Sequence, residues 1–182
     1  DSVLYARDDL ETLLHDLTAR PGEKVFILAH SMGSQLVMEA LRQIALRGDR
    51  QVLSRISGVV LMSPDIDPDV FDRQAAAIRQ LPQPFLIFIT KADRVLTLSG
   101  LVTGRKPRLG VIDAAEKVQR GDVQVVDVTE LSDGEGYNHF VPVTSPAAIR
   151  MLNGIIAQAG GVNSAFLRDM ALPLPAAKYV EP

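Results

Sequence analysis

Four continuous apolar runs divide the chain. They are rich in β-branched residues and lie at Val25–Ala29, Ile56–Met62, Phe85–Thr90 and Val123–Val128. Apolar residues at consecutive rather than alternating positions are typical of strands that are covered on both faces, as in a parallel sheet. We therefore predict four buried strands.

Helical periodicity fills the segments between these runs. Leucines recur at helical spacing within Asp9–Ala19, and a second apolar stripe runs through Gly33–Arg47. A weaker helix is predicted for Pro68–Leu81, and a last helix begins at Ser145, with a proline in its first turn. Alternating strands and helices predict an α/β fold, a three-layer sandwich around a mostly parallel sheet.

The length of the chain is that of one ordinary domain. We place a single domain at residues 1–159 and expect 160–182, which is rich in proline, to form a C-terminal tail that packs on the surface or frays. The segment Leu98–Gly110 mixes glycine, proline and basic residues, which predicts a loop. Its basic cluster is interpreted as solvated and consists of Arg105, Lys106 and Arg108.

Composition and charge exclude several classes of function. A net charge of −3, spread along the chain, offers no basic surface for nucleic acid. The chain has no cysteine, which excludes disulfides and thiolate sites, and it has no apolar run long enough to span a membrane. These features do not decide between a cytoplasmic and a periplasmic location.

A serine directly follows the first predicted strand. In A-H-S-M-G, Ser31 stands between the strand that ends at Ala29 and the helix that begins at Gly33. Small residues two positions before and two after a serine are typical of a nucleophile elbow, where strand and helix backbones approach closely. The amide of Met32, at the start of the helix, is placed to donate to an oxyanion. This pattern makes Ser31 a candidate nucleophile.

A serine nucleophile needs a base, and the chain has three histidines. We interpret His15 as a surface residue opposite the leucine stripe of its helix. His30 faces away from the Ser31 side chain and serves in packing or hydrogen bonding. His139 follows the fourth strand in the glycine-rich stretch G-E-G-Y-N-H-F, where a base would meet the serine.

The base in turn needs an acid to orient it. Asp93 lies just after the third strand, where its carboxylate could accept the Nδ1 proton of His139. The alternative acid is Asp65, in S-P-D-I-D-P-D-V-F after the second strand. Asp67 and Asp69 of the same stretch could reach this loop too, but we interpret them as turn and helix-capping residues. The stretch lacks the glycine and distal glutamate of a calcium loop, so we predict no metal site there.

These motifs together resemble a known family. The order Ser31, Asp93, His139 is similar to that of the α/β-hydrolase superfamily. More narrowly, A-H-S-M-G, S-P-D-I-D-P-D-V-F, T-K-A-D-R-V-L-T-L-S and N-H-F resemble a bacterial α/β-hydrolase family of undefined substrate, over roughly Asp8 to Ile156. The resemblance implies a serine hydrolase of esters or related acyl groups, with Ser31 as nucleophile, His139 as base and Asp93 as acid, and without a cofactor.

The chain departs from the family pattern in two ways. Ala29 stands where the family usually has glycine, which is a mild change. Members ordinarily carry further strands and a second oxyanion amide before the first helix, so we expect an N-terminally truncated fold without a cap domain. The edge of strand 25–29 would then be covered by a partner or by a missing segment. The alternative to an enzyme is a catalytically impaired interaction module, and the sequence does not separate hydrolysis from acyl transfer.

Overall fold

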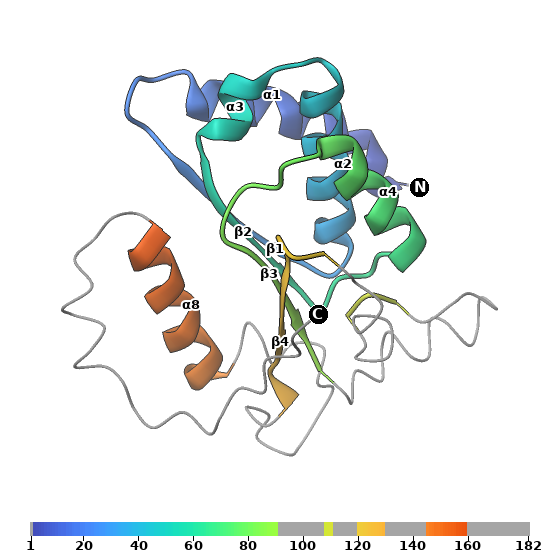
Figure 1. Ribbon diagram of the computed structural model, residues 1–182, viewed down its shortest axis with the longest axis vertical. Helices are drawn as coiled ribbons and strands as arrows, with labels where there is room; N and C mark the ends of the chain where they lie inside the picture. The colour runs from blue at the N-terminus through green and yellow to red at the C-terminus, as the bar shows by residue number, and fades with distance from the viewer. Residues whose placement is uncertain (1, 91–107, 111–119, 130–144, 160–182) are drawn as a thin grey trace.

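The computed structural model describes residues 2–90, 108–110, 120–129 and 145–159 (Figure 1). The predictions for Asp93 and His139, for Arg105 and Lys106, and for the tail 160–182 lie outside the described residues.

The described elements alternate in type along the chain. Their bounds are η1 Ser2–Ala6, α1 Arg7–Thr18, β1 Val25–His30, α2 Met32–Leu46, α3 Arg50–Ser54, β2 Ile56–Met62, α4 Pro68–Ile78, β3 Phe85–Ile89, β4 Gln124–Asp127 and α8 Pro146–Ala159. Each predicted strand and helix is present, with ends that shift by a few residues.

The four strands form one parallel sheet in the order β1-β2-β3-β4. The two connections that the structure describes in full are helical crossovers: α2 and α3 lie between β1 and β2, and α4 lies between β2 and β3. All carboxyl ends of the strands therefore meet at one edge of the sheet. This confirms the predicted α/β class with a parallel sheet.

Both faces of the sheet are covered, as continuous apolar strands require. On β2, Val59 and Leu61 pack toward one core cluster, while Val60 and Met62 pack toward another. The first cluster includes residues of α1, α2, α3 and α4, and the second includes Leu152 of α8. Figure 1 shows the same arrangement, with α8 separated from the other helices by the sheet. The result is a three-layer sandwich.

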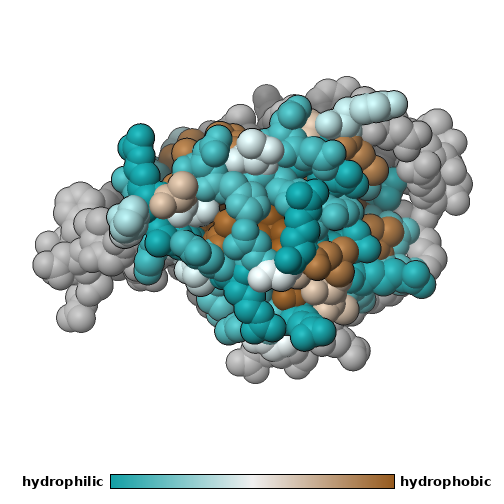
Figure 2. Space-filling view, turned by 90° about the horizontal axis from the view of Figure 1, so that it is seen from above, coloured by the Kyte–Doolittle hydropathy of each residue, from teal (hydrophilic) through white to brown (hydrophobic). Residues whose placement is uncertain are grey.

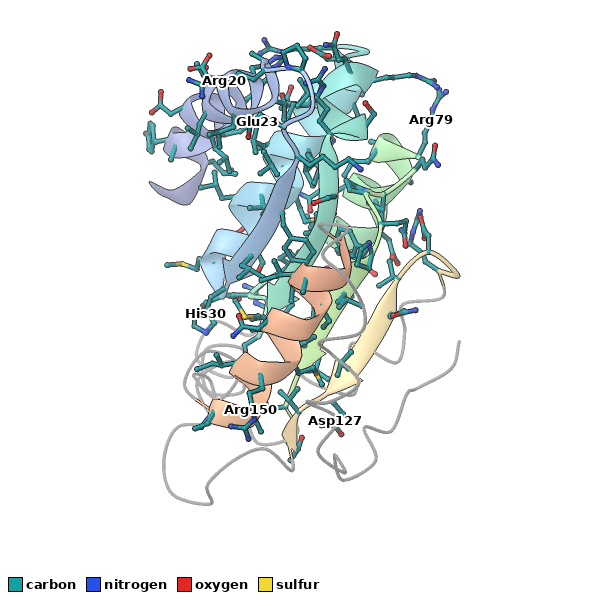
Figure 3. All side chains as sticks on the ribbon, turned by 90° about the vertical axis from the view of Figure 1, so that its left-hand side faces the viewer. Arg20, Glu23, His30, Arg79, Asp127 and Arg150 are labelled. Atoms are coloured by element: carbon teal, nitrogen blue, oxygen red, sulfur yellow. The ribbon has the colours of Figure 1, made fainter. Side chains whose placement is uncertain are left out.

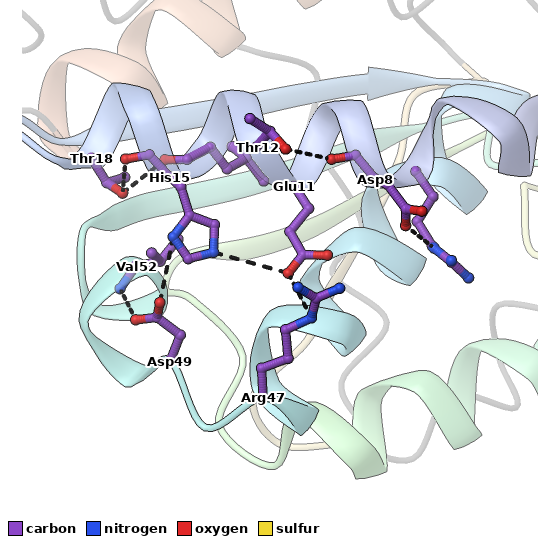
Figure 4. A network of polar contacts seen from close by, with 10 residues as sticks. Asp8, Glu11, Thr12, His15, Thr18, Arg47, Asp49 and Val52 are labelled. Atoms are coloured by element: carbon purple, nitrogen blue, oxygen red, sulfur yellow. Dashed lines mark hydrogen bonds and ion pairs between the residues drawn. The ribbon is translucent and has the colours of Figure 1, made fainter.

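Helix α1 buries a different face from the one that its leucines suggest. Glu11, Leu14 and Thr18 are buried, whereas Leu13 is 50% exposed and Leu17 is 46% exposed. These buried residues are spaced at i, i+3 and i+7, on the face of α1 that meets α2. The negative charge of Glu11 on this face is compensated by Arg47, whose Nε lies 3.1 Å from Glu11 Oε1 (Figure 4).

The prediction that His15 is a surface residue is incomplete, because two carboxylates lie beside it. Its side chain is half-exposed and lies between two carboxylates, 3.4 Å from Asp49 and 3.9 Å from Glu11 (Figure 4). Asp49 also caps α3, accepting a bond of 3.4 Å from the amide of Val52. Helix α3 was not predicted, because five residues are too few to show an apolar period.

An open cavity of about 880 Å³ lies at the amino end of the sheet, the end opposite Ser31. Figure 2 looks onto this end and shows hydrophobic residues between hydrophilic ones. Lys24, Arg50 and Arg79 contribute positive charge to its lining, but the carboxyl ends of α2, α3 and α4 face it too. Helix carboxyl ends carry partial negative charge, so the protein itself offsets these cations.

The absence of a side chain at Gly58 makes room for the ring of Phe26 on the neighbouring strand. Gly58 lies opposite Phe26, and a Cβ at this position would stand 2.4 Å from Phe26 Cε2 and 3.1 Å from Pro84 Cδ. We predict that Gly58→Ala lowers the free energy of unfolding by about 1–3 kcal/mol, because overpacking displaces the ring. Urea denaturation measures the change. Addition of Phe26→Leu should recover part of the loss, and strictly additive effects would contradict this explanation.

Candidate functional site

The candidate site is centred on Ser31, between the end of β1 and the start of α2. Its backbone has φ 53° and ψ −125°. These angles fall outside the left-handed helical region and match the first central position of a type II′ turn, where glycine is favoured. A serine in such a conformation carries strain of about 1–3 kcal/mol, and strain of this kind is typical of functional sites.

Backbone hydrogen bonds hold this conformation on both sides. The amide of Ser31 donates to the carbonyl of Met62 at 3.0 Å, which ties it to the end of β2. Its carbonyl accepts from the amide of Ser34 at 3.1 Å and from the amide of Asp65 at 3.2 Å. The surrounding structure thus fixes both peptide groups of Ser31, which is what a strained residue needs in order to persist.

The helix that follows places its amino end directly at Ser31. Helix α2 begins at Met32, one residue earlier than predicted, and runs for 15 residues. The first amides of a helix lack partners within it and carry partial positive charge, which suits the stabilisation of an oxyanion. The Met32 side chain is exposed, so its main contribution to the site is its backbone amide.

The two small residues beside Ser31 have different surroundings. Ala29 is buried, and its carbonyl accepts a hydrogen bond of 3.4 Å from Ser34 Oγ. A Cβ placed on Gly33 would meet no atom of the described residues within 4 Å. The expectation that close backbone approach requires a small residue at position 33 is therefore not supported by that part of the chain.

Polar residues also follow the other strands at this edge. Ser63 comes directly after β2 and Thr90 directly after β3, and each is fully buried. Neither hydroxyl has a hydrogen-bond partner within the described segments. At the end of β4, Asp127 Oδ1 accepts bonds from the amide and the hydroxyl of Thr129. The carboxyl edge therefore gathers polar groups above an apolar sheet, as is usual for ligand sites in α/β folds.

Asp65, the alternative acid, is engaged by a basic residue. Arg108 Nε lies 2.9 Å from Asp65 Oδ1, and the two side chains are 14% and 23% exposed, respectively. The alignment does not meet hydrogen-bond geometry, so the contact is an ion pair. The prediction that Arg108 is solvated was wrong, because composition alone cannot show that a loop cation has a carboxylate beside it.

The other residues of the acidic stretch and the histidines occupy separate places. Asp67 caps α4, accepting a bond of 2.9 Å from the amide of Asp69, which confirms its predicted capping role, and Asp69 lies in the first turn of the helix. His30 is the last residue of β1 and is half-buried. Figure 3 shows it at the same end as Asp127 and Arg150, opposite Arg20, Glu23 and Arg79.

A comparison with known families agrees with this geometry. The family model described as an alpha/beta hydrolase of unknown function (DUF900) matches residues 1–156. The chain belongs to this family. No match was found among curated proteins or among solved structures.

In the part of the chain that the structure describes, no group of three or more histidine or acidic side chains could hold a metal ion. Nor is any described helix both long and apolar enough to cross a membrane.

The strain at Ser31 can be tested without any substrate. We predict that Ser31→Gly is more stable than Ser31→Ala by about 1–2 kcal/mol, because glycine adopts a positive φ without a Cβ clash. The two variants are compared by urea denaturation, and the same pair at exposed Ser54 serves as control, where alanine should be the more stable because Ser54 lies in α3. Equal stability of the two variants at position 31 would show that this turn is not strained.

Proposed function

We propose that this α/β hydrolase is a serine hydrolase that cleaves carboxylic esters or related acyl groups through an acyl-enzyme. Ser31 is the proposed nucleophile, His139 the base, Asp93 the acid, and the Met32 amide an oxyanion donor. The family match supports a hydrolase in general, and the triad is the more specific part of this proposal.

The single observation that carries the proposal is the backbone of Ser31. A φ of 53° presents its side chain at a sharp strand-to-helix turn, next to the amino end of a 15-residue helix. A nucleophile elbow has these parts, namely a strand, a strained serine and a helix whose first amide faces the reacting oxygen. A positive φ alone would not carry the proposal, because Ser63 at the end of β2 also has one; what supports Ser31 is the positive φ together with the helix that begins at the next residue.

The length of chain between Asp93, His139 and the nearest described elements supports their proposed roles in the triad. Asp93 follows Thr90, the residue after β3, by three positions, so it can stand at most about 11 Å from Thr90. His139 precedes Ser145, the residue before α8, by six positions, which limits its distance from Ser145 to about 22 Å. Arg150, in the first turns of α8, lies at the end of the molecule where β4 finishes (Figure 3). Both residues are thus within reach of the edge that carries Ser31.

The ion pair with Arg108 favours Asp93 over Asp65 as the acid. A triad acid directs its carboxylate to the Nδ1 proton of the base. The Asp65 carboxylate instead has a guanidinium 2.9 Å from one oxygen, in a contact that is largely shielded from water. Asp65 would have to give up this partner, in whole or in part, to orient an imidazole.

The proposed reaction has two acyl-transfer steps. His139 takes the Ser31 hydroxyl proton as the oxygen attacks the carbonyl carbon, and the Met32 amide donates to the oxyanion that forms. His139 then protonates the departing alkoxide, leaving an acyl-serine. Water, activated by the same histidine, attacks this ester, releases the carboxylic acid and restores the serine.

The connections described at this edge favour small or exposed substrates. Between β2 and β3 the chain places one helix, α4, and no inserted domain. An uncapped site exposes the nucleophile, which suits short acyl groups or esters on larger molecules better than deeply enclosed lipids.

The proposal predicts covalent labelling at one serine. An alkyl fluorophosphonate should add one phosphonyl group to the protein, and Ser31→Ala should abolish the addition, because only an activated hydroxyl reacts at a useful rate. Intact-mass spectrometry measures it. His139→Ala should slow labelling by roughly 10³-fold or more. Ser54→Ala, which removes an exposed serine, is the matched control and should label normally.

Absence of labelling in the folded wild-type protein would favour the alternative of a non-catalytic interaction module. Labelling without turnover of any ester, but with acyl transfer to added alcohols, would instead identify a transferase that uses the same serine.

The identity of the acid gives a separate prediction. Asp93→Asn should reduce the labelling rate by roughly 10³–10⁴-fold, because an amide in place of the acid favours the wrong histidine tautomer. Asp65→Asn should reduce it much less. The labelling rates of the two variants, measured at equal concentration and with unfolding curves for both, decide between them. The reverse order of effects would make Asp65 the acid.

A further inference from the structure

We propose that Asp65 and Arg108 form a clamp that positions the Ser31 turn, so that both are positioning residues of the site. The inference rests on the proposed function, because it concerns how the nucleophile is held. It assigns a role to a basic residue that composition places on a solvated loop.

Asp65 contacts Ser31 through its backbone and Arg108 through its side chain. Its amide donates to the Ser31 carbonyl at 3.2 Å, and its carboxylate lies 2.9 Å from Arg108 Nε. Only the Cα–Cβ–Cγ link separates the two contacts. The ion pair thus anchors the residue whose amide bonds to the Ser31 carbonyl.

The short segment that carries Arg108 is hydrogen-bonded to the turn after β2 and to the residue after β3. The amide of Leu109 donates to Ile66 at 2.9 Å, and the amide of Gly110 donates to Pro64 at 3.0 Å. The carbonyl of Gly110 accepts a bond of 3.4 Å from Thr90, at the end of β3. Residues 108–110 thus bridge the turn after β2 and the residue after β3, with Asp65 and Arg108 at one end of the bridge.

Burial makes this contact more than a surface ion pair. Asp65 Oδ1 and Arg108 Nε are both shielded from water, and Leu109 beside them is fully buried. Removal of one partner would leave the other charge poorly solvated, and the local backbone would rearrange to hydrate it. That rearrangement would reach the Ser31 carbonyl before any other part of the proposed site.

The structure offers a control pair, in which the arginine is more exposed, at 64%, than Arg108, at 14%. Arg47 and Glu11 also join two distant segments, with Nε 3.1 Å from a shielded carboxylate oxygen. Arg47 follows the last residue of α2, so its backbone lies about 24 Å along the helix from Ser31. Loss of this pair should lower stability without disturbing the serine.

The test combines the fluorophosphonate labelling rate with amide hydrogen exchange in the full chain. Asp65→Asn and Arg108→Gln should each slow labelling by about 10–100-fold, because a small misplacement of the nucleophile has effects of this size. The double variant should be no slower than the slower single variant, because the two residues act as a unit. Glu11→Gln and Arg47→Gln should label at the wild-type rate.

Hydrogen exchange tests the clamp independently of reactivity. In Arg108→Gln, the amides of Asp65, Leu109 and Gly110 should exchange faster than in the wild type, relative to the amide of Val59 in the centre of the sheet. In Arg47→Gln, these amides should keep their relative protection.

The outcomes separate this inference from the proposed function. If the wild type does not label, the proposed function fails, and the exchange measurement alone decides whether the clamp exists. If the wild type labels and the Asp65 and Arg108 variants label as fast as the control variants, the clamp is refuted. If Asp65→Asn alone abolishes labelling while Arg108→Gln does not slow it, Asp65 is the triad acid and the clamp is refuted too.

Discussion

The backbone conformation of Ser31 is the constraint on which the candidate site depends. The chain turns from β1 into α2 within this one residue, and it does so at angles that favour glycine. The strain is tolerated because the amide is bonded to β2 and the carbonyl is bonded to Ser34 and Asp65. The partners outside α2 come from β2 or from the turn after it. The position of the proposed nucleophile is therefore a property of two neighbouring strands together.

This dependence makes the register of the sheet part of the site. His30 pairs with Met62, so that the next amide, that of Ser31, meets the Met62 carbonyl. A slip by one residue would remove this partner and would exchange the buried faces of the strand, because side chains alternate along it. The packing of Val59 and Leu61 against one layer and of Val60 and Met62 against the other opposes such a slip. Hydrophobic packing thus holds the register, and the register in turn places the hydrogen bond between the Ser31 amide and the Met62 carbonyl.

Features that leave a local pattern in the sequence could be predicted, whereas contacts between residues far apart along the chain could not. Strands buried on both faces leave continuous apolar runs, and the change from an apolar run to a helical stripe marks the junction at Ser31, so the sheet and the turn at Ser31 were predictable. The buried face of α1 was not, because Glu11 is accommodated by Arg47 from another helix. Arg108 could not be paired with Asp65 for the same reason, since their contact joins residues 43 positions apart. Asp93 and His139 stay predictions that rest on order along the chain.

A comparison of two serines shows why Ser31 is the better candidate nucleophile. Ser63 also follows a strand, also has a positive φ, of 44°, and donates its amide to the next strand, at Phe88. Its hydroxyl, however, is fully buried, and a segment without regular secondary structure follows it rather than a helix. Ser31 is half-buried and is followed at once by the amino end of α2. A kinked backbone at a strand end is therefore insufficient by itself: the kink presents a reactive oxygen only where a helix supplies free amides and a substrate can approach.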